Sequence, residues 1–143
     1  MRLVATLVLA LWLIGALVLT LQSAYPLPGQ VVHGNLIPFH TLATYLDNLG
    51  SWFWIRNALG NLALLLPLGL LGPIALAALD RWWRVALVAL LISATIELLQ
   101  LAVPDRSADI DDVLVNVAGA LLGYAMLKVA RHVLAPRELG KPR

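Results

Sequence analysis

The sequence predicts an all-α protein, an integral membrane four-helix bundle that forms a single transmembrane domain over residues 1–143. Composition is the first observation behind this prediction. Of the 143 residues, 61% are hydrophobic and only 13% are charged, whereas about 25% of the residues in an average soluble domain are charged. The second observation is that four apolar stretches are long enough to span about 30 Å of hydrocarbon as helices. Lipid must therefore solvate much of the surface.

The four predicted helices lie at about residues 3–21, 57–79, 83–103 and 113–134. The first exceeds the apolar core of a signal peptide, and a poor cleavage site follows it, so we expect an uncleaved anchor. The connection from Gln22 to Arg56 is rich in proline and glycine, which predicts a long irregular first outer loop with a short interfacial helix at Thr41 to Leu49. Pro67 and Pro73 predict a kink or local unwinding in the second span.

Basic residues set the predicted orientation. They precede the first span, separate the second from the third, and end or follow the fourth: Arg2, Arg81, Arg84, Lys128, Arg131, Arg137, Lys141 and Arg143. Because lysine and arginine accumulate in cytoplasmic segments, both termini are expected in the cytoplasm. The two outer connections agree, since they carry only Arg56 and Arg106 against five aspartates. The charges show no basic stripe with interleaved aromatics, so no nucleic-acid partner is predicted.

Polar side chains share one face on each of three spans. They are Asn57 and Asn61, then Ser93, Glu97 and Gln100, and finally Asp112 and Asn116. At about 1.5 Å per residue, the inner members lie about 5 to 9 Å below the outer boundary. An ionisable group at this depth faces the protein interior, so Glu97 is expected to be buried beside Asn116, Asn61 or Arg106. Interhelical hydrogen bonds explain the amides equally well.

The fourth span begins with an acidic cluster and continues into a small-residue face. Asp109, Asp111 and Asp112 can cap free N–H groups there, but capping does not readily explain four acids between Asp105 and Asp112. We therefore expect an acidic lip above Glu97 that binds a cationic group. A weaker alternative is a divalent cation held by Asp109 and Asp112; no other cofactor is predicted. Gly119 and Gly123 form a G-x-x-x-G pair, which predicts close helix packing.

Four segments in a fixed order give the chain a resemblance to a known family. "NLIPF" at Asn35, "GNLALLLPLGLLGP" at Gly60, "IELLQ" at Ile96 and "DIDDVLVNVAGALLGY" at Asp109 resemble the VanZ-like membrane proteins, over a region of about residues 35–134. The resemblance implies a multi-pass protein of the bacterial plasma membrane. Its founding member is associated with resistance to teicoplanin, a glycopeptide that carries a lipid tail.

The resemblance also implies a set of functional positions. Carried over motif by motif, they are Asn35, Pro38, Asn61, Pro67, Gly69, Glu97, Gln100, Arg106, Asp109, Asp112, Asn116 and Gly119. The segment "PDRSADIDD" departs from the family, which often shows a glycine and an arginine at different spacing before the acids. This departure leaves the role of Arg106 open.

These observations favour a binding function over catalysis. We expect an outer-leaflet polar pocket, lined by Glu97, Gln100, Asp112, Asn116, Asn61, Arg106, Asp109 and Asn35, that binds an amphipathic or lipid-linked cell-envelope molecule. One alternative is a metal-dependent intramembrane enzyme acting on a lipid phosphate or ester, with Glu97 or Asp112 as base and the loop residues His33 and His40 as further candidates. An ion-coupled transporter and an accessory subunit that packs against membrane proteins or copies of itself also remain open.

Overall fold

The computed structural model describes residues 1–22, 34–103 and 107–134, and every long element within them is an α-helix. The helices are α1 (Arg2–Thr20), α2 (His40–Asp47), α3 (Trp52–Ala75), α4 (Trp82–Gln100) and α5 (Ile110–Leu134), with a 3₁₀ turn, η1 (Ala77–Leu79), after α3. All but α2 are long and apolar enough to cross a membrane. This result confirms the predicted all-helical fold with four spans, and α2 falls where a short interfacial helix was expected.

The observed ends of the spans differ from the predicted ones by a few residues. Helix α3 begins at Trp52 rather than at about residue 57, because the aromatic residues assigned to the boundary continue the helix. Its end comes at Ala75, where the next residue, Leu76, has an extended backbone. Helix α5 begins at Ile110 instead of residue 113, so that Asp111 and Asp112 lie in its first turn. Hydropathy places the start of each span after its flanking charged residues, whereas α3 and α5 begin before them.

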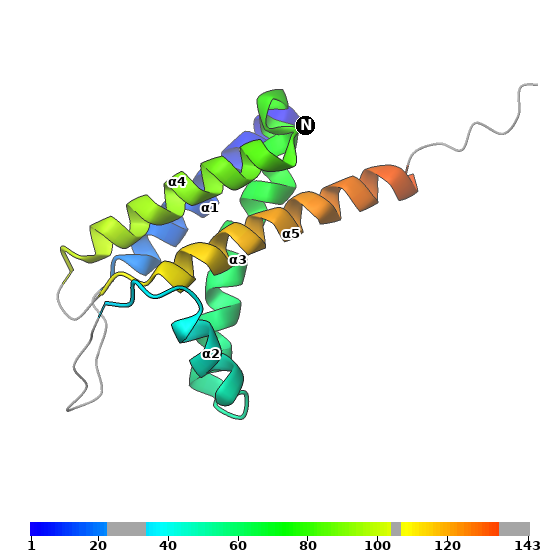
Figure 1. Ribbon diagram of the computed structural model, residues 1–143. Coiled ribbons are helices and arrows are strands. Elements are labelled where there is room, and N and C mark those ends of the chain that lie inside the picture. The colour runs from blue at the N-terminus through cyan, green and yellow to red at the C-terminus, as the bar shows by residue number, and fades with distance from the viewer. Residues whose placement is uncertain (23–33, 104–106, 135–143) are drawn as a thin grey trace, which may run out of the picture.

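Helix α3 crosses the other long helices rather than running beside them (Figure 1). It packs most extensively against α5, and glycines make this close approach possible. A Cβ on Gly69 of α3 would collide with the carbonyl of Ala120, and one on Gly119 would collide with the carbonyl of Leu62. Gly123 meets the backbone of α3 in the same way. The predicted glycine packing face is therefore confirmed, and its partner is α3.

Helix α3 continues as one α-helix through Pro67 and Pro73, without the local unwinding that the sequence suggested. A proline removes one backbone donor and crowds the carbonyls of the preceding turn. Trp12 of α1 reaches this turn, where its indole Nε1 donates a hydrogen bond to the carbonyl oxygen of Leu64 at 2.8 Å. A side chain from a neighbouring helix thus bonds to the backbone of the turn that Pro67 disturbs.

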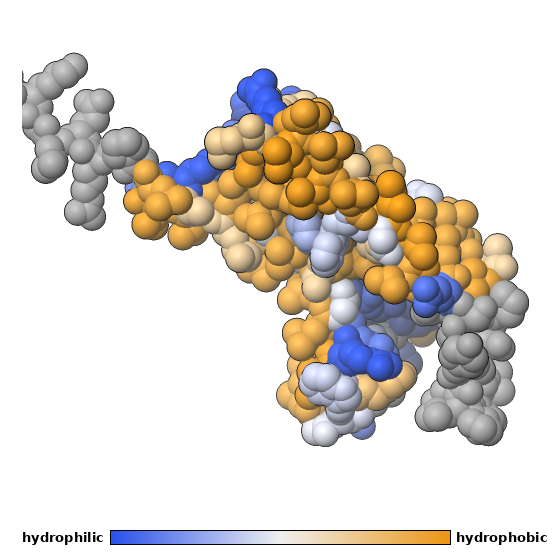
Figure 2. Space-filling view, turned by 180° about the vertical axis from the view of Figure 1, so that it is seen from behind, coloured by the Kyte–Doolittle hydropathy of each residue, from blue (hydrophilic) through white to orange (hydrophobic). Residues whose placement is uncertain are grey.

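The core lies where α3, α4 and α5 meet, and apolar side chains cover most of the outer surface. Leu65, Val85 and Ala89 are fully buried in this core. Orange, apolar residues dominate the face shown in Figure 2, while blue, hydrophilic ones gather mainly toward the ends. A surface of this kind is typical of helices that face lipid.

The end of the molecule opposite α2 is held by a small charged cluster. Asp80, between η1 and α4, accepts contacts of 2.9 Å from both Lys128 and Arg131 of α5. The hydrogen bond from Lys128 and the charge of Arg131 lower the pKa of Asp80 below its usual range. This cluster joins the C-terminal half of α5, which projects beyond the other helices in Figure 1, to the connection between α3 and α4.

Candidate ligand-binding site

Asp111 organises the end of the molecule that carries α2, here called the α2 end. Its side chain is fully buried, although it belongs to the first turn of α5. The carboxylate accepts hydrogen bonds from the backbone N–H groups of Phe39 at 2.6 Å, Thr41 at 2.7 Å and Leu42 at 3.1 Å. Free N–H groups at the start of a helix need such acceptors. A carboxylate of α5 therefore caps α2, and Phe39 is held in a left-handed conformation with φ of 68°.

Asp109 joins the segment before α2 to the start of α5. Its Oδ1 accepts hydrogen bonds from Asn35 Nδ2 at 3.0 Å and from the backbone N–H of Asp111 at 2.8 Å, and its Oδ2 accepts one from Thr41 Oγ1 at 2.6 Å. A parallel β-bridge also pairs Asn35 with Asp109. The structure thus brings these two predicted site residues together, but their polar groups hold the loop to α5.

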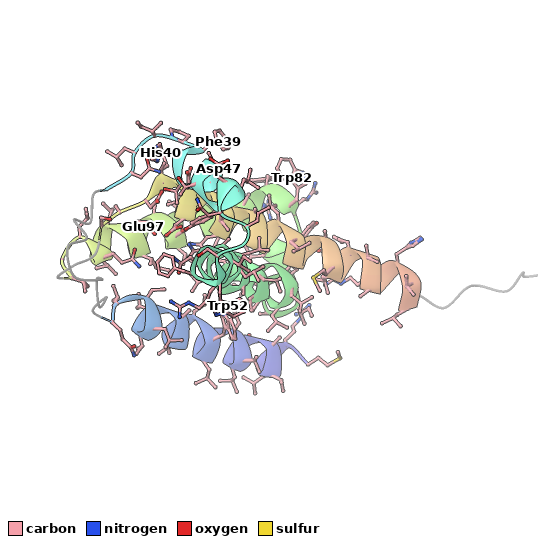
Figure 3. The ribbon with its side chains drawn as sticks, turned by 90° about the horizontal axis from the view of Figure 1, so that it is seen from below. Phe39, His40, Asp47, Trp52, Trp82 and Glu97 are labelled. Atoms are coloured by element: carbon pink, nitrogen blue, oxygen red, sulfur yellow. The ribbon has the colours of Figure 1, made fainter. Side chains whose placement is uncertain are left out.

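Glu97 and Asn116 face the interior, as expected for polar groups inside a span. Glu97 is 6% exposed and Asn116 is 1% exposed. Glu97 Oε2 accepts a hydrogen bond from the backbone N–H of Asp109 at 2.8 Å, and Asn116 Nδ2 donates one to Ser93 Oγ at 2.7 Å. Figure 3 shows Glu97 directed from α4 toward the start of α5. The backbone partner of Glu97 was not among the three side chains predicted for it.

Not every predicted position can be placed. Arg106 and Asp105 of the predicted acidic lip lie outside the described residues, as does His33. His40 begins α2 and is exposed at the surface of the α2 end (Figure 3). Within the described ranges, no three His, Cys, Asp or Glu side chains come together in a way that could hold a metal ion. The divalent cation therefore stays a prediction from the sequence.

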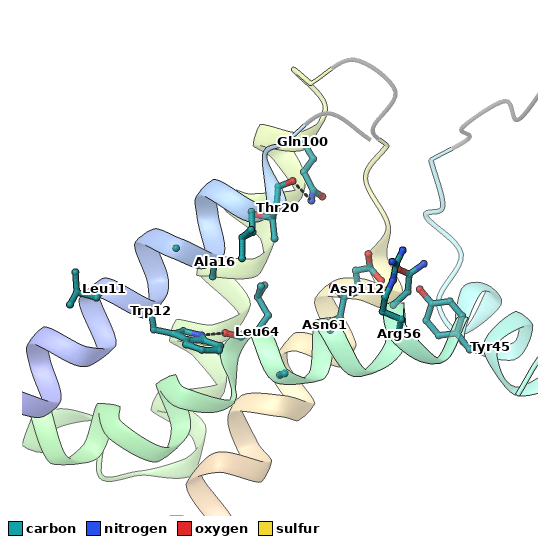
Figure 4. A pocket seen from close by; sticks show the side chains of 15 residues that line it. Leu11, Trp12, Ala16, Thr20, Tyr45, Arg56, Asn61, Leu64, Gln100 and Asp112 are labelled. Carbon is teal, nitrogen blue, oxygen red and sulfur yellow. Dashed lines mark hydrogen bonds between the residues drawn. The ribbon is translucent and has the colours of Figure 1, made fainter. Parts of the chain in front are cut away.

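A cavity of about 650 Å³ lies between α1 and α3 and reaches the α2 end (Figure 4). It is lined by Leu11, Trp12, Gly15, Ala16, Leu19, Thr20, Tyr45, Arg56, Asn57, Gly60, Asn61, Ala63, Leu64, Gln100 and Asp112. All five helices contribute to this lining. The volume falls within the range of about 300 to 1,000 Å³ that is usual for small-molecule sites.

The cavity is apolar at one end and polar at the other. Side chains of α1 and the middle of α3, such as Leu11 and Leu64, form the apolar part. Arg56, Asp112 and Tyr45 converge at the opposite end in Figure 4. Two glycines leave room between the helices, because an added Cβ on Gly15 or Gly60 would meet nothing within 4 Å. A ligand with an apolar chain and a polar head would match both ends.

Asp112 is the acidic group of the polar end. Asn61 and Tyr45 form side-chain hydrogen bonds with its carboxylate. Burial, followed by the charges of Asp112 and its neighbours, raises the pKa of the Tyr45 phenol well above its usual range. The phenol therefore stays protonated and donates to the carboxylate. Gln100, which also lines the cavity, donates from Nε2 to the carbonyl oxygen of Thr20 at 3.2 Å and thereby connects α4 to α1 (Figure 4).

The cavity contains three of the eight predicted site residues and several that were not predicted. Asn61, Gln100 and Asp112 line it, whereas Asn35, Asp109, Glu97 and Asn116 do not. Arg56, Tyr45 and the wall formed by α1 were not identified from the sequence. Helix α1 has no polar stripe, so periodicity gave no reason to place it at a site. Gly15 and Gly60 could have indicated the cavity in the sequence, because a glycine leaves space on the face of an apolar helix.

Comparison with protein families now adds to this geometry. The family model described as VanZ/LLP1 matches residues 3–131. The chain belongs to the VanZ/LLP1 family. The match begins at residue 3, so it includes α1 as well as the motifs from Asn35 onward. No curated protein and no solved structure matches the chain. Four helices long and apolar enough to cross a membrane, together with the match to the VanZ/LLP1 family, indicate a membrane protein.

Proposed function

We propose that the protein binds an amphipathic or lipid-linked molecule of the cell envelope in the cavity between α1 and α3, and that this binding links it to teicoplanin resistance. The observation that carries the proposal is the division of one cavity into an apolar part and a polar end. The chain belongs to the VanZ/LLP1 family, and the link to resistance rests on the association of the founding VanZ-like protein with teicoplanin resistance. The site needs no catalytic residue for this role.

The position of the cavity in the membrane suits such a ligand. Helices α1 and α3 are both spans, so the apolar wall lies at the depth of the lipid chains. If the α2 end faces outward in the bacterial plasma membrane, as the basic residues predict, the polar end lies at the level of the outer head groups. A ligand could then leave part of its tail in lipid while its head group contacts Arg56, Asn61 and Asp112. The enzyme and transporter alternatives gain no supporting observation among the described residues and stay predictions.

Filling the cavity tests the proposal directly. The Cβ of a leucine at position 60 would meet nothing within 4 Å, Gly60 lines the cavity, and leucine favours a helix more than glycine does. We expect a sensitive host that expresses the wild type to tolerate more teicoplanin but not more vancomycin, and we expect Gly60→Leu and Asp112→Asn to lose most of this protection. The susceptibilities are compared at matched membrane levels of each variant.

Gly50→Leu is the matched control, because Gly50 also has open space around it but does not line the cavity. It should protect as well as the wild type. Full protection by Gly60→Leu would show that the cavity is not the site. A wild type that gives no protection would contradict the link to teicoplanin, and loss of protection in Gly50→Leu as well would point to a general effect of added leucine.

A further inference from the structure

Asp112 has a buried oxygen atom that needs a hydrogen-bond donor. Tyr45 and Asn61 bond to this carboxylate, yet its Oδ1 is inaccessible to water and has no partner among the residues that the structure describes. A buried acceptor without a donor destabilises the folded protein, and more so when it is charged. Asp112 lines the cavity through other atoms of its side chain, so a donor in the cavity reaches Oδ1 only if the carboxylate turns this oxygen toward the cavity.

The surroundings of Asp112 favour a donor with a positive charge. The carboxylates of Glu97, Asp109 and Asp111 lie close enough to act on it electrostatically. The start of α5 and the adjacent part of α4 are therefore acidic. Charge interactions strengthen where water is excluded, so this region attracts an ammonium group more than a neutral hydroxyl group.

Arg56 supplies the opposite charge at the same end of the cavity. Its side chain is exposed, and its guanidinium lies 5.9 Å from the centre of the Phe53 ring. Among the described residues, no carboxylate lies within 4 Å of it. Figure 4 shows Arg56 beside Asp112 and Tyr45. A guanidinium presents a fork of N–H donors that matches the oxygen atoms of a phosphate.

We propose that the polar end of the cavity binds a zwitterionic head group, with a primary ammonium on Asp112 and a phosphate on Arg56, while one acyl chain follows α1. This ligand is an aminophospholipid. The inference rests on the proposed function, because it names the head group of the amphiphile that occupies the cavity. A volume of about 650 Å³ holds a head group and part of one chain, and the rest of the lipid stays in the bilayer.

Native mass spectrometry of the full-length protein in detergent can measure this preference. The probes are phosphatidylethanolamine, phosphatidylcholine and phosphatidylglycerol with identical acyl chains. Phosphatidylcholine keeps the charge of the amine but has no N–H donor, and phosphatidylglycerol has no amine. We expect phosphatidylethanolamine to bind about tenfold more tightly than either, because a hydrogen bond to a charged group contributes about 1.5 kcal/mol or more.

Two variants separate the two charges of the head group. Asp112→Asn should remove the preference for phosphatidylethanolamine over phosphatidylcholine, because it removes the anionic acceptor. Arg56→Gln should weaken both lipids by a similar factor, because both carry the phosphate. Arg2→Gln is the control for charge, since Arg2 is exposed and lies outside the cavity lining; it should change neither value. Thermal unfolding of each variant in detergent verifies that it remains folded.

Trp12 provides an independent readout, because it lines the apolar part of the cavity. Phosphatidylethanolamine with a brominated acyl chain should quench its fluorescence, measured as the difference between the wild type and Trp12→Phe. Gly60→Leu should abolish this quenching. No quenching of Trp12 in the wild type, together with lipid binding that Gly60→Leu leaves unchanged, would overturn the proposed function itself.

The head-group proposal can also fail by itself. Equal affinity for the three lipids, with binding still lost in Gly60→Leu, would keep the cavity as an amphiphile site and overturn the aminophospholipid. If Asp112→Asn and Arg56→Gln both lower the unfolding temperature without changing lipid preference, the two charges serve each other in the fold, and the head-group proposal is equally overturned.

Discussion

At the scale of single residues, the acids at the start of α5 divide into two roles. Asp109 and Asp111 are engaged with backbone and side-chain donors of the α2 end, whereas Asp112 lines the cavity. The sequence predicted that some of these acids cap a helix, and Asp109 does cap α5 through the N–H of Asp111. That Asp111 caps α2 could not be predicted, because the capped groups lie about seventy residues away in the chain.

Replacing Asp111 should loosen the α2 end. We expect Asp111→Asn to lower the free energy of unfolding by about 1.5 to 3 kcal/mol, because it weakens the charge-assisted hydrogen bonds from three backbone N–H groups. Thermal unfolding in detergent measures the change. Asp47→Asn, at the exposed C-terminal end of α2, should shift the unfolding temperature much less. Equal shifts in the two variants would mean that the buried carboxylate contributes nothing beyond its charge.

At the scale of helices, the glycines of α3 and α5 set the crossing that defines the fold. Gly119 and Gly123 were identified from their four-residue spacing, which predicts a packing face on α5. Their partner helix could not be identified in this way, since spacing says nothing about which neighbour occupies a face. Gly69 supplies the matching surface on α3, where its Cα lies against the backbone of Ala120.

Gly69→Ala should therefore separate the two helices. An added methyl group would collide with the Ala120 carbonyl, and overpacking of this kind costs about 1 to 3 kcal/mol. Gly60→Ala is the control on the same helix, because its Cβ would meet open space. It should be neutral or slightly stabilising, since alanine favours a helix. If both variants unfold at the same temperature in detergent, the close contact between α3 and α5 does not limit stability.

At the scale of the whole molecule, composition predicted the four spans but not the arrangement that forms the cavity. Helical periodicity places Asn61, Gln100 and Asp112 on the inner faces of their own helices, and all three line the cavity in the structure. Helix α1 lacks such a stripe, yet Trp12 and Thr20 connect it to α3 and α4. Contacts of this type use backbone carbonyls as acceptors, and a carbonyl carries no residue-specific signal in the sequence.

The direction in which the whole molecule faces decides whether the polar end of the cavity can meet outer-leaflet ligands. The chain contains no cysteine, so single cysteines can report the orientation in intact cells. Asp47→Cys lies on α2, and Ala77→Cys lies in η1 near the opposite end; both positions are exposed. We expect a membrane-impermeant maleimide to label Asp47→Cys in intact cells and Ala77→Cys only after permeabilisation. Arg81 and Arg84 follow η1 in the chain, and basic segments are retained in the cytoplasm. The reverse pattern would place Arg56 and Asp112 at the inner leaflet. A cavity in that orientation could not take up a ligand from outside the cell, so the link to teicoplanin would be contradicted. The proposal that the cavity binds a membrane lipid would still hold.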